Sequence, residues 1–67
     1  MTKADKMFKD LGYEQHGTGE FGNWDRSLFD YIIFEAGAVD LGETTPYTVE
    51  THLAIHEKMI ELGYFNK

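Results

Sequence analysis

The tripeptide Leu-Gly-Tyr occurs twice, at Leu11–Tyr13 and at Leu62–Tyr64, each time after a stretch with helical spacing of its apolar residues. A glycine directly after the last apolar residue is a common helix ending, and the apolar residue after it folds back onto the last turn. A threonine, which is a favoured N-cap, precedes each stretch. The sequence therefore predicts one helix from about Lys3 to Leu11 and a second from Val49 to Leu62.

Between these two helices the residues are typical of strands and turns. The run Leu28–Glu35 is rich in aromatic and β-branched residues, which favour strands. Shorter strands are predicted at Tyr13–His16 and Ala38–Leu41, and the pattern leaves open a fourth around Glu20–Trp24. Sequential strands joined by short turns pair antiparallel. We therefore expect an α+β fold, α-β-β-β-α, in which the terminal helices flank a three- to four-stranded antiparallel sheet and cover its apolar face.

The length of the chain, 67 residues, has room for one domain, residues 1–67. The chain has no cysteine for a disulfide or a thiolate metal site, which fits a reducing cytoplasm better than secretion. Met1–Asp10 lacks the continuous apolar run of a signal peptide, and no stretch is long enough to span a membrane. We expect a soluble cytoplasmic protein.

The net charge is −6, and the charged residues are unevenly distributed. Ten acidic residues and a single cation, Arg26, lie between Asp10 and Glu57, whereas the lysines lie towards the two ends of the chain. Such an acidic middle section repels phosphate backbones, so we do not expect direct binding of nucleic acid. Two interpretations stay open: the acids only keep a small protein soluble, or they form a face that meets a basic partner.

Two histidines, His52 and His56, lie one turn apart inside the apolar arc of the second predicted helix. The apolar members of that arc are Val49, Leu53, Ile55, Met59, Ile60 and Leu62. The predicted polar side consists of Glu50, Ala54, Glu57, Lys58 and Glu61. We expect both imidazoles to pack in the core, each bonded to a sheet residue such as a tyrosine, and neutral burial would then weaken the fold below about pH 6. A partner-facing groove and a transition-metal site, with His16, Asp30 or Asp40 as a third ligand, stay open as alternatives.

Little in the sequence indicates catalysis. Ser27 is the only serine and has no recognisable arrangement with a histidine and an aspartate. The segment Gly17–Gly19 lacks the Lys-Ser/Thr pair of a phosphate-binding loop. A chain this short also rarely encloses a substrate pocket. We therefore expect no enzymatic activity and no cofactor.

Two segments of the chain carry a family resemblance. The first comprises Ala4–Phe8 and Leu11–Glu14, and the second comprises Tyr47–Glu50, His52, Ala54, Ile55, Lys58 and Glu61–Tyr64. In these segments, about half of its length, the chain resembles small proteins encoded by phages and prophages of Gram-positive bacteria, a group without an agreed function. The section Gly17–Arg26 departs from the group, whose members are more polar and lysine-rich there. The resemblance brings no catalytic residues. It implies an accessory gene of a mobile element, a setting rich in small acidic proteins that disarm host defences.

The leading hypothesis is a phage-type accessory protein that binds and inhibits a host nucleic-acid-handling protein through its acidic surface. A CRISPR effector nuclease fits as the partner, because its nucleic-acid channel is strongly basic. The predicted acidic contacts are Asp25, Asp30, Glu35, Asp40 and Glu43. Trp24, beside the only cation of the middle section, is a candidate anchor, although packing in the core is the favoured interpretation.

Two other functions stay open. The main alternative is a self-associating structural or scaffold protein of a phage, which uses a sheet edge or the exposed part of the histidine-bearing helix face. The third is a metal-dependent sensor at His52 and His56.

Overall fold

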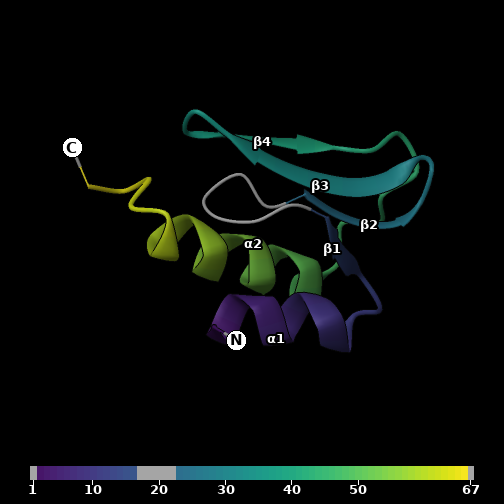
Figure 1. Cartoon of the computed structure of the whole chain (residues 1–67), viewed down its shortest axis with the longest axis horizontal. Coiled ribbons are helices and arrows are strands. Elements are labelled where there is room, and N and C mark those ends of the chain that lie inside the picture. The colour runs from purple at the N-terminus through teal and green to yellow at the C-terminus, as the bar shows by residue number, and fades with distance from the viewer. Residues whose placement is uncertain (1, 17–22, 67) are drawn as a thin grey trace.

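The computed structural model describes residues 2–16 and 23–66 and has the predicted α+β architecture. Its elements are α1 (Lys3–Asp10), β1 (Glu14–His16), β2 (Asn23–Ser27), β3 (Asp30–Glu35), β4 (Ala38–Leu41) and α2 (Val49–Glu61) (Figure 1). The fourth strand that the sequence left open is present as β2. Its described residues run from Asn23 to Ser27, and residues 20–22 of the expected segment lie outside the described residues.

Both helices begin where their sequences predict and end one residue earlier, with Leu11 and Leu62 as their C-caps. The hydroxyls of Thr2 and Thr48 each accept a hydrogen bond from the backbone N–H three residues further on, both at 3.1 Å. At the other ends, Gly12 and Gly63 have φ values of +93° and +76°, a conformation that glycine adopts without strain. The tyrosine after each glycine donates its backbone N–H to the carbonyl five residues earlier, at 3.1 and 2.9 Å. These bonds satisfy carbonyls that the end of a helix leaves free.

The four strands form one antiparallel sheet in the order β1-β2-β3-β4. Both helices lie on the same side of this sheet (Figure 1). The burial of β3 alternates accordingly: Asp30, Ile32 and Phe34 are buried, whereas Tyr31 and Ile33 are only partly buried. The sheet therefore has an inner face that meets the helices and an outer face that they do not cover.

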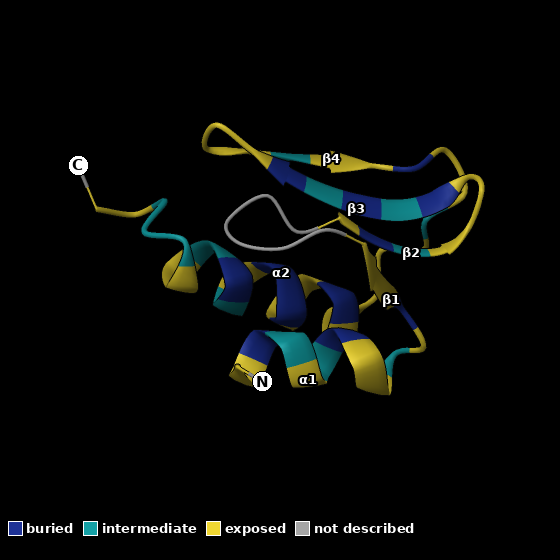
Figure 2. Ribbon diagram, viewed as in Figure 1, coloured by how far each residue is buried: buried dark blue, intermediate teal, exposed yellow. Residues whose placement is uncertain are grey.

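A cluster of aromatic rings joins the two layers. The ring of Phe8 on α1 stacks on that of Trp24 on β2, with centroids 5.0 Å apart and an interplanar angle of 24°. Phe8 also meets Tyr13 and Phe34 edge-on, at 6.2 and 6.0 Å. Ile32, Ala54 and Ile55 complete the buried core between the sheet and the helices (Figure 2). Aromatic rings bury much area per residue, so a short chain obtains most of its core from these few side chains.

The rotation of α2 about its axis differs from the prediction. Its buried residues are Thr51, Ala54, Ile55 and Lys58, two of which had been assigned to the polar side. Three members of the predicted apolar arc, Val49, Leu53 and Ile60, are exposed instead. The prediction was wrong because α2 packs against α1 as well as against the sheet.

An internal ion pair explains why a lysine lies on the buried side of α2. The ammonium of Lys58 lies 3.2 Å from a carboxylate oxygen of Asp5 on α1 and 3.7 Å from one of Glu61. Glu61 also accepts a hydrogen bond from the backbone N–H of Ala4 at 3.0 Å. Burial alone would raise the pKa of Asp5, but the hydrogen bond and charge of Lys58 outweigh it and lower that pKa. The pairing of Lys58 with Asp5 and Glu61 thus determines which side of α2 is buried. The spacing of apolar residues alone does not predict it.

Replacement of Lys58 by methionine should lower the free energy of unfolding by about 2 kcal/mol near neutral pH, because Asp5 and Glu61 lose their cation in a partly buried site. Urea denaturation followed by circular dichroism measures this difference. Lys6→Met is the matched control, since Lys6 is exposed and should tolerate the change within about 0.5 kcal/mol. Equal losses in the two variants would contradict the assignment.

The same pair predicts a pH dependence. The pKa of Asp5 is lower in the folded than in the unfolded chain. The ionised Asp5 carboxylate therefore adds to the free energy of unfolding above its unfolded pKa of about 4, and this stabilisation is lost as pH falls through the folded pKa. The gap in stability between the wild type and Lys58→Met should therefore narrow on acidification. A gap that stays constant from pH 7 to about pH 2 would show that Asp5 is not the partner that matters.

Candidate functional site

The outer face of the sheet is a surface that no described helix covers. Residues paired across neighbouring strands point to the same face, so the register defines its rows. One row runs Glu14, Asp25, Tyr31 across β1, β2 and β3. A second row runs His16, Asn23, Ile33, Asp40 across all four strands. Glu35 extends the face at the end of β3, where it pairs with Ala38.

This face combines an apolar centre with carboxylates around it. Tyr31 and Ile33 are half-buried, and Leu28, in the turn between β2 and β3, is 80% exposed. The three residues line one open hollow together with Glu14, His16, Asn23 and Asp25. Asp25 bonds to His16, with 3.1 Å between its carboxylate oxygen and the ring Nε2. In the part of the chain that the structure describes, no lysine or arginine occupies a position in these rows, so carboxylates outnumber the basic side chains of this face, of which the rows contain only His16.

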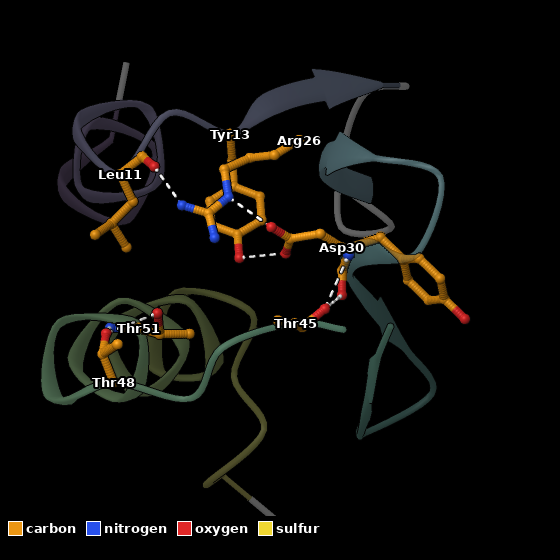
Figure 3. A network of polar contacts seen from close by, with 8 residues as sticks. Leu11, Tyr13, Arg26, Asp30, Thr45, Thr48 and Thr51 are labelled. Atoms are coloured by element: carbon orange, nitrogen blue, oxygen red, sulfur yellow. Dashed lines mark hydrogen bonds and ion pairs between the residues drawn. The ribbon is translucent and has the colours of Figure 1, made fainter. Parts of the chain in front are cut away.

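The single cation of the middle section is held by a network at the edge of the inner face (Figure 3). The guanidinium of Arg26 donates to a carboxylate oxygen of Asp30 at 2.7 Å and to the carbonyl of Leu11 at 3.0 Å. It also lies over the ring of Tyr13, 4.4 Å from the centroid. The Tyr13 hydroxyl donates to the other oxygen of Asp30 at 2.7 Å. The positive charge is therefore neutralised away from the outer face.

The predicted contact residues separate into two groups. Asp25, Glu35 and Asp40 lie on the outer face, and Glu43 is exposed in the connection after β4. Trp24 is fully buried, in line with the core interpretation, and Asp30 is buried in the Arg26 network. Their burial removes both residues from the surface that a partner can reach. Trp24 is buried because it pairs with Ile32 on the inner side of the sheet, and Asp30 is buried because it alternates with Tyr31 on β3, which a list of acidic and aromatic residues does not reveal.

Sequence reasoning missed five residues of this surface: Glu14, Asn23, Leu28, Tyr31 and Ile33. The alternation within Leu28–Glu35 was the available signal, since Tyr31, Ile33 and Glu35 must share one face of a strand. Which of the two faces the helices cover depends on packing between elements distant in sequence.

The histidine pair lies on the surface, not in the core. His52 and His56 are both exposed, with their rings 6.4 Å apart and nearly parallel. The Tyr47 hydroxyl bonds to Nδ1 of His52 at 2.7 Å, but Tyr47 belongs to the connection before α2 and not to the sheet. The prediction of buried, sheet-bonded histidines was therefore wrong, and the expected weakening below pH 6 loses its premise. Within residues 2–16 and 23–66, no group of three or more His, Asp or Glu side chains is arranged to hold a metal ion.

Comparisons of the chain with protein-family models, with curated proteins and with solved structures found no match. Among the described helices, none has the length and apolar character needed to cross a membrane.

Ionisation of the Tyr13 hydroxyl tests the network in which Tyr13 and Asp30 hold Arg26 at the inner face. Burial and the hydrogen bond to Asp30 raise the pKa of Tyr13 to about 12. The protonated Tyr13 hydroxyl therefore adds to the free energy of unfolding. This stabilisation is fully present below the unfolded pKa of about 10 and is lost as pH rises towards the folded pKa. The wild type should therefore lose stability between about pH 10 and 12 by a step that Tyr13→Phe lacks.

The measurement is the midpoint of urea unfolding across this alkaline range. At neutral pH, Tyr13→Phe should cost about 1 kcal/mol for the lost hydrogen bond. Tyr31→Phe, on the outer face, is the control and should keep the alkaline step. If Tyr13→Phe kept the whole step as well, the hydroxyl of Tyr13 would not be its source.

Proposed function

We propose that this protein is a small phage-type accessory protein, without enzymatic activity, that binds and inhibits a host protein through the outer face of its sheet. The observation that supports this proposal is the excess of carboxylates on that face. Asp25, Glu35 and Asp40 lie on it without a described lysine or arginine beside them, while Arg26 bonds to Asp30 at the inner face.

The chemistry of the face favours a protein partner with a basic surface. Tyr31, Ile33 and Leu28 offer an apolar centre of the kind that supplies most of the affinity in protein interfaces. The surrounding carboxylates attract lysine- and arginine-rich surfaces and repel acidic ones, which accelerates association and selects the partner. They equally repel a nucleic-acid backbone, so the partner is not a nucleic acid.

The partner class that we propose is a nucleic-acid-handling protein with a basic groove, for which a CRISPR effector nuclease is the leading case. Its channel holds a nucleic-acid duplex through positive charge, and an acidic surface placed there competes with the phosphates. The resemblance of the two chain ends to phage and prophage proteins supplies the biological setting. Inhibition then follows from occupancy of the groove alone and requires no catalytic residue on this chain.

The test is affinity capture of the tagged protein from a bacterial lysate, followed by binding measurements on the purified captured protein. The triple variant Asp25→Asn/Glu35→Gln/Asp40→Asn should bind it about tenfold to a hundredfold more weakly. Glu57→Gln is the control and should bind like the wild type, because it removes a charge from the helix layer, away from the outer face. Wild-type affinity should fall between about 50 mM and 500 mM salt, and the bound protein should displace a labelled duplex from the partner.

Three results would contradict the proposal. Affinity that is independent of salt, or unchanged in the triple variant, would show that the outer face is not the interface. Simultaneous binding of the duplex would exclude inhibition by occupancy. Recovery of only the chain itself would instead favour the self-associating scaffold protein.

A further inference from the structure

A second surface, on the opposite layer of the molecule, concentrates exposed apolar residues. The described residues include eight large hydrophobic side chains that are exposed, and five of them lie on α2 or beside its ends. These five are Tyr47, Val49, Leu53, Ile60 and Phe65. Val49 is 70% exposed, Leu53 50% and Ile60 49%. Such a concentration in one place is typical of an interaction site, whereas single exposed apolar residues are not.

The spacing of these residues places them on one line along α2. Val49, Leu53, His56 and Ile60 are separated by four, three and four residues, which keeps them on a single side of a helix. This is the spacing by which one helix packs along another. We call these four residues the α2 seam. The opposite side of α2, with Ala54, Ile55 and Lys58, already contacts α1 and the sheet. The helix therefore has one apolar side for the fold and another that no described element covers.

A groove between the two helices runs beside the α2 seam. The helices are antiparallel, since Ala4 at the start of α1 bonds to Glu61 at the end of α2. Met7 of α1, Leu11 directly after it and Leu53 of α2 form the apolar lining of a groove of about 200 Å³. Asp10 and Glu50 are its other two lining residues, and both are acidic.

We propose that the α2 seam and this groove bind an amphipathic helix of a partner protein, with apolar residues at three- and four-residue spacing and lysines or arginines beside them. The apolar residues of such a helix would cover Leu53, Val49 and Ile60, and its cations would face Asp10 and Glu50. Docking of an amphipathic helix in an apolar groove is a common mode of recognition, and the flanking charges select the partner.

A second copy of this chain does not match that occupant. The only lysine described in α2 is Lys58, which is buried against Asp5 and offers no charge to Glu50. Two antiparallel α2 seams would instead bring Glu50 of one copy towards Glu57 of the other. The exposed residues of α1 are polar, with Lys3, Lys6, Lys9 and Asp10 and no large apolar side chain. Neither helix of a second copy thus combines an apolar seam with flanking cations.

The experiment uses the full chain and two fluorescein-labelled helical peptides. Both peptides carry the same leucine seam, and the flanking positions are lysine in one and glutamate in the other. Fluorescence anisotropy should show tighter binding of the lysine peptide, by about threefold to tenfold, with a difference that shrinks as salt is added. Leu53→Asn/Ile60→Asn should weaken binding about tenfold or more, and both side chains are exposed, so the fold should persist.

Charge variants separate this site from the outer face of the sheet. Asp10→Asn/Glu50→Gln should abolish the preference for the lysine peptide. Asp25→Asn/Glu35→Gln/Asp40→Asn should leave peptide binding unchanged, although it should weaken the partner of the proposed function. Absence of peptide binding would therefore contradict only the site at the α2 seam. Absence of partner binding through the outer face would contradict only the proposed function.

Three outcomes would overturn the inference. The first is no binding of the lysine peptide at about 100 μM, far above the dissociation constants typical of specific interfaces. The second is equal binding of the two peptides at low salt. The third is a dimer in sedimentation equilibrium that Leu53→Asn/Ile60→Asn converts to a monomer, because a second copy would then occupy the seam.

Discussion

The stacking of Phe8 on Trp24 is the contact on which the arrangement of the layers depends. It joins α1 to β2, and the edges of Tyr13 and Phe34 close around it. A chain of 67 residues without cysteine has only its apolar core to hold it together, and a domain this small buries a modest share of its surface. Both helices are needed on one face of the sheet to enclose these rings. The outer face stays free because the chain has no third helix among its described residues to cover it.

The electrostatic character of the outer face follows from the same packing. Arg26 is the one cation among ten acidic residues in the middle section, and its side chain lies over Tyr13 and against Asp30. A guanidinium bonded to a buried carboxylate stabilises the sheet edge and is not available elsewhere. The carboxylates of the outer rows are thereby left without a lysine or arginine among the described residues of that face. The network of Arg26, Asp30 and Tyr13 therefore stabilises the sheet edge and also leaves the outer face acidic.

The parts of this fold that are local in sequence could be predicted, and the parts set by packing could not. The Leu-Gly-Tyr endings and threonine caps depend on a few adjacent residues, and they appear in the structure with the expected left-handed glycines. The burial of Trp24 and Asp30 depends on the register of β2 with β3, which two distant strands decide together. Likewise, the side of α2 that is buried depends on α1, through the pairing of Lys58 with Asp5.

The error in the rotation of α2 also carries information about function. A helix with apolar residues on more than one side gives an ambiguous pattern, because the fold can bury only some of them. In α2 the buried side is filled by small or charged-paired residues, Thr51, Ala54 and Lys58 beside Ile55, while Val49, Leu53 and Ile60 remain in solvent. These three side chains are not part of the core, and their exposure to solvent does not stabilise the fold. Their alignment with the acidic groove beside α1 is the reason to assign them to a partner, so the residues that misled the structural prediction are the ones that mark the second surface.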